Sequence, residues 1–88
     1  MPADQPEWIA HAQRALGENV RGARVYANLT QEELAHRAEI DRSSVQRLEG
    51  GHNDVRFSHL LRVADALNVT LAELMPRVTA RRVQGDGP

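Results

Sequence analysis

The sequence predicts an all-α, compact five-helix domain. Apolar residues recur at helical spacing in several separate stretches, three pairs with the spacing of a capping box mark helix starts, and no stretch alternates as a strand would. The chain has 88 residues, enough for one small core. We therefore expect one domain over residues 1–76, followed by a mobile tail over residues 77–88 that is poor in apolar side chains.

The first helix is expected over about residues 6–26. Its inward face follows a helical period through Ile9, Ala12, Leu16, Val20 and Ala23. Gly17 and Gly22 each weaken a helix by roughly 1 kcal/mol relative to Ala. Packing against the rest of the domain must therefore hold this helix together.

Both ends of the first helix carry recognisable signals. Asp4 and Glu7 have the spacing of a capping box, and Pro6 suits a first turn. Asn28 is expected near the other end, because Asn tolerates the left-handed backbone that closes a helix.

Residues 30–51 predict two short helices joined by a tight turn. Thr30 and Glu33 form a capping box at the start of the first. Asp41 offers an N-cap for the second, and Gly50 is expected to end it in a left-handed conformation. Their buried sides consist of Leu34, Ala35, Ala38, Val45 and Leu48. This arrangement is a helix-turn-helix.

The second helix of this motif carries an unusually polar outer face. Beyond its two buried residues it consists of hydrogen-bonding side chains: Arg42, Ser43, Ser44, Gln46 and Arg47. Such side chains read base edges and phosphates in the major groove of DNA. The sequence therefore predicts a nucleic-acid-binding helix at this position.

Two further helices are expected after a loop over residues 50–54. The fourth helix is predicted to present one apolar face, made of Phe57, Leu60, Leu61, Ala64 and Leu67. Asn68 ends it. Thr70 and Glu73 form a third capping box, which opens a short fifth helix that Pro76 stops.

Composition excludes several classes of protein. The absence of cysteine excludes a disulfide framework. No apolar run approaches the roughly 20 residues that cross a bilayer, and the first residues lack the basic and apolar regions of a signal peptide. We therefore expect a cytoplasmic protein with no membrane association.

The overall charge of the chain does not favour binding to nucleic acid. Eleven basic and twelve acidic residues give a net charge of -1. Any affinity for DNA must therefore come from a local cluster of arginines. All eleven basic residues are Arg, so every cationic contact can be bidentate.

Nothing in the sequence supports an enzyme, a cofactor or a small-molecule substrate. The four histidines have no metal-ligand spacing and no cysteine to join them, so we expect no metal site. Ser43 and Ser44 lack the glycine context of a nucleophile elbow, and the chain has no Gly-rich phosphate loop.

The ordered series from about Leu16 to Met75 resembles the phage-repressor-like (Cro/Xre) helix-turn-helix family. The matching residues are Leu16, Val20, Arg21, Arg24, Leu29–Ala35, Ile40, Ser44–Val45, Leu48–Gly51, Leu60, Val63–Ala64, Ala66–Leu67 and Val69. The resemblance implies a lambda-repressor-like fold. It also implies a transcriptional regulator, of the repressor kind, that binds specific sequences of double-stranded DNA.

The resemblance also implies roles for individual residues. Those that contact bases would be Arg42, Ser43, Gln46 and Arg47. Those that contact the DNA backbone would be Gln31, His52, Asn53 and Arg56, with Arg21 open between phosphate contact and simple solvation. Arg24 and Glu49 match a semi-buried ion pair between the first and third helices.

Three positions depart from the family pattern. Glu39 stands where the family has Gly in the turn, which places a side chain on strained left-handed backbone and a carboxylate near DNA. Asn68 replaces another Gly. Arg56 stands where the family has a Ser or Thr cap.

Apolar residues outside the helix-turn-helix motif form a candidate surface for a protein partner. The sequence leaves the identity of that partner open. Trp8 and Ile9 either fold back onto the fifth helix near Leu74 and Met75, or form a homodimer contact, which we favour. The residues that could join this surface are Leu61, Leu71, Met75 and Val78. A second hypothesis is the antitoxin of a toxin–antitoxin pair, and a third is a protein-interaction module that does not bind DNA.

Overall fold

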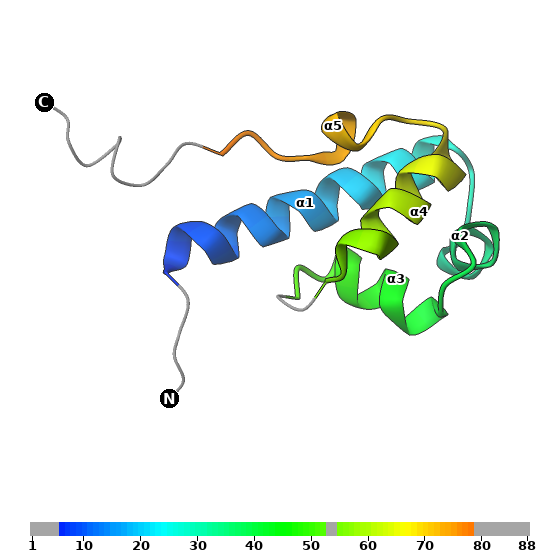
Figure 1. The fold of residues 1–88 in the computed structure, drawn as a ribbon, viewed down its shortest axis with the longest axis horizontal. Coiled ribbons are helices and arrows are strands. Elements are labelled where there is room, and N and C mark those ends of the chain that lie inside the picture. The colour runs from blue at the N-terminus through cyan, green and yellow to red at the C-terminus, as the bar shows by residue number, and fades with distance from the viewer. Residues whose placement is uncertain (1–5, 53–54, 79–88) are drawn as a thin grey trace, which may run out of the picture.

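Five α-helices follow one another in the computed structural model, which describes residues 6–52 and 55–78 (Figure 1). Their bounds are α1 (Glu7–Tyr26), α2 (Gln31–Ala38), α3 (Arg42–Glu49), α4 (Phe57–Leu67) and α5 (Leu71–Leu74). Over this part of the chain no strand occurs. The predicted all-α, five-helix architecture is confirmed.

The core lies where α2 meets α3 and α4, and where the C-terminal half of α1 crosses α3. Its buried apolar residues are Val20, Leu29, Leu34, Ala35, Ala38, Val45, Leu48, Leu60, Val63, Ala64, Leu67 and Leu74. Each helix contributes one stripe of small or branched side chains, as amphipathic helices in small domains do. The described residues bury no charged or polar residue completely.

Four helix ends use the same left-handed turn. The left-handed residues are Asn28, Glu39, Gly51 and Asn68, with φ between 59° and 79°. After each one, the next backbone N–H donates to the carbonyl five positions earlier at 3.0–3.1 Å. In three of the turns that next residue is apolar and packs in or on the core: Leu29, Ile40 and Val69. The repeated Schellman turn therefore both ends the helix and anchors the connection.

The prediction that Gly50 is left-handed is wrong. Gly50 has φ -81°, and its N–H still donates to the carbonyl of Gln46 at 2.9 Å, as in a continuing helix. The reversal falls one residue later, at Gly51. A pair of adjacent glycines allows either position, and sequence alone does not distinguish them.

Both predicted capping boxes at threonine are present. The Thr30 hydroxyl accepts from the Glu33 N–H at 3.0 Å, and the Glu33 carboxylate accepts from the Thr30 N–H at 2.8 Å. Thr70 and Glu73 repeat the arrangement. These reciprocal bonds satisfy N–H groups that a helix start otherwise leaves without partners.

The structure tests one of the two predicted aspartate caps. Asp41 occupies the N-cap position of α3, but its carboxylate accepts no hydrogen bond from the helix, so the predicted side-chain cap is wrong. Asp4 lies outside the described residues. The residue before α1 is Pro6, which makes no side-chain cap.

The apolar face predicted for α4, with Val63 beside it, is only partly buried. Phe57 is 61% exposed and Leu61 is 46% exposed. The predicted residues Leu60, Ala64 and Leu67 are buried, together with Val63. Phe57 and Leu61 are four residues apart, so they form an outer apolar strip beside the buried one.

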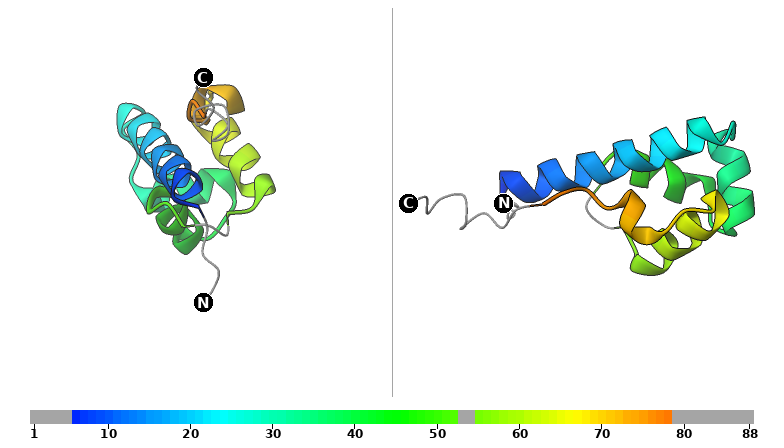
Figure 2. Two further views of the ribbon diagram at one scale, coloured as in Figure 1. Left: turned by 90° about the vertical axis from the view of Figure 1, so that its left-hand side faces the viewer. Right: turned by 90° about the horizontal axis from the view of Figure 1, so that it is seen from above.

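The segment after α5 runs alongside the N-terminal half of α1 (Figure 2). The Asn19 side-chain amide donates to the Leu74 carbonyl at 2.9 Å and joins α1 to the end of α5. Arg77 and Val78, which were expected in a mobile tail, belong to this segment. The rest of the predicted tail, residues 79–88, lies outside the described residues.

Gly17 lets α1 approach α3 closely. A Cβ atom at Gly17 would lie 2.6 Å from the carbonyl oxygens of both Leu48 and Glu49. A Cβ atom at Gly22, on the same helix, would meet nothing within 4 Å. The close packing of α1 on α3 therefore requires glycine at position 17, whereas no contact requires it at position 22.

We predict that Gly17→Ala destabilises the protein by about 1–3 kcal/mol, because backbone atoms at the crossing must move apart. Gly22→Ala should stabilise it by about 0.5–1 kcal/mol, because alanine is the better helix former. Urea denaturation of both variants tests this. Equal effects at the two positions would contradict the close packing of α1 on α3.

Candidate nucleic-acid interface

The outer face of α3 is polar and exposed. Arg42, Ser43, Gln46 and Arg47 are all exposed, while Val45 and Leu48 on the other side of the helix are buried. The four polar residues span positions i, i+1, i+4 and i+5, so they lie on one side of the helix. The side chains predicted from the sequence to contact bases thus share one accessible surface, which we call the groove face.

A buried ion pair fixes the C-terminal end of α3 to α1. The guanidinium of Arg24 donates from Nε to Glu49 Oε2 at 2.6 Å and from Nη2 to Glu49 Oε1 at 3.0 Å. The two side chains are only 12% and 5% exposed. The expected pair is therefore confirmed, in the bidentate geometry that suits arginine and a carboxylate.

Two further hydrogen bonds complete this network. Arg24 Nη1 donates to the Leu29 carbonyl at 2.8 Å, in the connection that leads to α2. Gln31 Nε2, in the first turn of α2, donates to Glu49 Oε1 at 3.0 Å. Residues of α1, α2 and α3 thus meet at one carboxylate, and Gln31 braces the end of α3.

The same contacts shift the titration of Arg24. Its hydrogen bond to Glu49 raises its pKa, burial opposes this rise, and the carboxylate charge adds to it. A raised folded-state pKa stabilises the fold at every pH below the unfolded value, and this stability is lost only in strong alkali. Near neutral pH the arginine side of the pair is therefore insensitive to pH.

Glu39 occupies the turn between α2 and α3 in left-handed backbone, with φ 59°. Its carboxylate accepts a hydrogen bond from Arg62 on α4 at 3.2 Å. Both side chains are largely exposed, so the pair contributes little stability. The pair places the Arg62 cation beside the Glu39 carboxylate, which the family resemblance implies lies near DNA.

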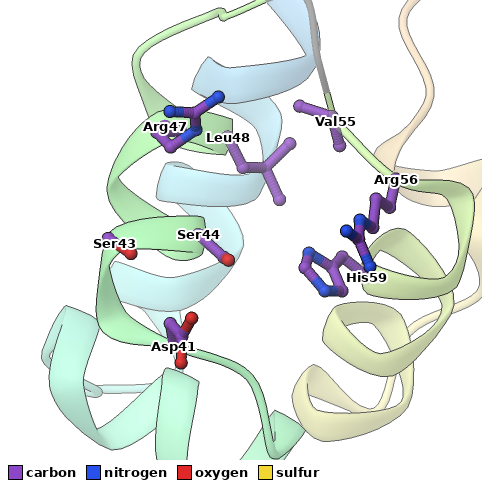
Figure 3. Close-up of a pocket in the computed structure, with 8 residues that line it drawn as sticks. All are labelled: Asp41, Ser43, Ser44, Arg47, Leu48, Val55, Arg56 and His59. Atoms are coloured by element: carbon purple, nitrogen blue, oxygen red, sulfur yellow. The ribbon is translucent and has the colours of Figure 1, made fainter.

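A polar cleft lies between α3 and the start of α4, with a volume of about 380 Å³ (Figure 3). Its walls carry polar side chains from both helices, and Leu48 and Val55 are its apolar members. The polar lining consists of Asp41, Ser43, Ser44, Arg47, Arg56 and His59. Ser43 and Arg47 also belong to the groove face, so the two surfaces are continuous.

The residues expected at the DNA backbone are spread around the groove face. Arg56 is exposed, precedes α4 without making a side-chain cap, and lines the cleft. His52 is exposed in the connection after α3, and Arg21 is exposed on α1. Asn53 lies outside the described residues.

An apolar groove lies between the N-terminal half of α1 and the segment after α5, with a volume of about 350 Å³. It is lined by Trp8, Ile9, Ala12, Gln13, Leu16, Met75, Pro76 and Val78. The indole N–H of Trp8 is buried there without a hydrogen-bond partner. Four of the six residues predicted for a dimer or partner surface meet in this groove, and Leu61 and Leu71 do not line it. Leu71 packs against the core instead.

The described residues also bear on metal and membrane binding. They contain no group of three His, Cys, Asp or Glu side chains that could hold a metal ion. No helix among them is both long and apolar enough to cross a membrane.

Sequence reasoning missed the cleft as a unit. It named Arg56 without His59, and it gave Ser44 no role of its own. The spacing of three between Arg56 and His59 puts them on one side of α4, which is a signal the sequence does contain. Their approach to Ser44 depends on how α3 and α4 each pack against α2, and no local pattern encodes that.

Comparison with known proteins identifies a family model and relatives that match this chain. A family model described as helix-turn-helix matches residues 20–74. The control protein C.SmaI of Serratia marcescens is 36% identical over 70 residues, which are 80% of this chain and 83% of that protein.

Two solved structures are similar in fold and sequence. The restriction-modification controller protein C.AhdI from Aeromonas hydrophila has a TM-score of 0.69 and 33% identity, over 72% of this chain and 96% of that one. The hypothetical transcription factor NHTF from Neisseria has a TM-score of 0.69 and 30% identity, over 96% of this chain and 94% of that one.

We predict that Arg24→Ala destabilises the fold by about 3 kcal/mol, because it leaves the Glu49 carboxylate buried without its cation. Arg62→Ala is the control, since it breaks the exposed pair with Glu39 and should cost less than about 1 kcal/mol. Chemical denaturation at neutral pH measures both. Similar losses in the two variants would contradict a structural role for the buried pair.

Proposed function

The chain belongs to the helix-turn-helix family of DNA-binding transcriptional regulators, and we propose that it represses transcription by placing α3 in the major groove of a specific duplex site. The match over residues 20–74 covers the whole of α2, α3 and α4, which carry the groove face and the cleft. In this family's motif the second helix reads the bases and the first crosses the backbone.

The observation that carries this proposal is the contrast between the two sides of α3. Its inner side is fixed by Val45, Leu48 and the Glu49 network, whereas its outer side presents only polar side chains. A helix held in this way presents donors and acceptors in a fixed array. Such an array discriminates among base edges, which a mobile surface arginine does not do.

Arg42 and Arg47 are the residues we assign to guanine, with Ser43 and Gln46 in support. A bidentate arginine contact to guanine O6 and N7 contributes about 1–3 kcal/mol of discrimination. The net charge of -1 provides no general attraction for DNA. Affinity would therefore depend on these few contacts and on phosphates beside them.

The backbone contacts follow from the same placement. Gln31 lies at the N-terminus of α2, where helix N–H groups favour a phosphate, and its side chain already joins α2 to α3. Arg56 and His52 lie after α3. We include Asn53 and Arg21 as further backbone contacts.

We also propose that the protein acts as a homodimer through the apolar groove between α1 and residues 75–78. Every residue that lines this groove lies outside the matched residues 20–74. Met75 and Val78 are 44% and 50% exposed beside it. A second copy would bury this apolar surface and give two reading helices, as symmetric operators require.

We predict that selection from a random duplex library recovers a palindrome with half-sites about one helical turn apart. Arg42→Ala and Arg47→Ala should each reduce affinity for the selected site by about 5- to 150-fold and relax the sequence preference. Arg37→Ala is the matched control, because Arg37 is an exposed residue of α2 that lies outside the groove face. Weak binding without sequence preference, equal in all variants, would overturn the regulator.

We predict that Met75→Asp converts the dimer to a monomer, because it buries a carboxylate in an apolar contact. Val25→Asp, which alters another exposed apolar residue near the C-terminal end of α1, should leave the dimer intact. Sedimentation equilibrium distinguishes these outcomes. If Met75→Asp stays dimeric and Leu61→Asp does not, the outer strip of α4 is the interface instead.

A further inference from the structure

One side chain in the cleft has no role in the contacts proposed so far. His59 lies in the first turn of α4, three residues after Arg56, and both line the cleft. Figure 3 shows the Arg56 guanidinium and the His59 ring pointing from α4 toward α3, where Ser44 projects into the same space. The cleft therefore brings together two nitrogen-bearing side chains and a hydroxyl.

This set of groups matches the chemistry of a phosphodiester. A guanidinium and a hydroxyl donate hydrogen bonds to phosphate oxygens, and a protonated imidazole adds a charged donor. The cleft also shares Ser43 and Arg47 with the groove face, so a duplex bound by the proposed contacts would carry a strand past it.

We propose that this cleft binds one backbone phosphate of the duplex and that His59 binds it in the protonated form, so that affinity for DNA rises as pH falls. The inference rests on the proposed function, since it names a proton-dependent contact within the same interface. It assigns to His59 a contact that is present only in part of the physiological pH range.

The charge of the bound phosphate sets the direction of this dependence. The charged side chains that line the cleft with His59 are Arg56 before α4, Arg47 on α3 and Asp41 at the start of α3. Arg62, one turn further along α4, is paired with Glu39. A bound phosphate brings negative charge among these cations, so the complex takes up a proton more readily than the free protein. By linkage, lower pH then strengthens binding.

The test compares affinity for a selected duplex at pH 6 and pH 8. If a phosphate raises the pKa of an imidazole by about one unit, affinity is roughly fivefold higher at pH 6. The dependence of log K on log salt should also steepen at pH 6, by about 0.9 for one added phosphate contact. Both effects should vanish in His59→Gln, and His59→Arg should bind tightly at both pH values.

His11→Gln and His36→Gln are the matched controls, because both histidines are exposed and neither lines the cleft. Both should keep the wild-type pH dependence. Thermal melts show whether each variant folds, and His59→Arg keeps the test informative even if His59→Gln loses stability.

Three outcomes would overturn the inference. Sequence-specific binding with no pH effect, or a pH effect that survives in His59→Gln, would remove the contact and leave the proposed function standing. A pH-dependent calorimetric signal with inorganic phosphate alone, without a pH effect on duplex affinity, would assign the cleft to a free anion. No binding of any duplex by the wild type would overturn both proposals.

Discussion

The position of α3 depends on one buried carboxylate. Glu49 accepts hydrogen bonds from Arg24 on α1 and Gln31 on α2, so three helices meet at the last residue of the helix proposed to read DNA. Gly17 provides the second constraint, because its missing side chain lets α1 lie directly against the backbone at Leu48 and Glu49. The Glu49 hydrogen bonds and the close approach at Gly17 together fix which side of α3 faces outward. A helix of 8 residues could not fix this orientation by itself.

The proposed recognition surface and the proposed dimer surface lie on different parts of the chain. The groove face and the cleft lie on α3 and the start of α4, within the matched family region. The apolar groove lies on the extended N-terminal half of α1 and the segment that follows α5. Because the two surfaces share no residue, a substitution in the apolar groove is expected to alter the proposed dimer without moving the side chains of the groove face.

Much of the fold was predictable because its signals are local. The box formed by Thr30 and Glu33 fixes the start of α2 within the sequence that forms it. Features that depend on packing were not predictable. Phe57 faces outward although Leu60, Ala64 and Leu67 of the predicted face are buried, and Asp41 provides no side-chain cap for α3. The cleft joins Ser44 to residues on a helix that begins more than ten positions later, which no periodicity encodes.

The most direct test of this account is an amide chemical-shift titration of the protein with its selected duplex. We expect the largest shifts on the outer face of α3 and in the first turn of α4, with the N-terminal half of α1 unchanged by DNA. Shifts confined to the groove between α1 and residues 75–78, with α3 unaffected, would contradict it. The fold would then serve a protein partner, and the polar face of α3 would be only a solvated surface.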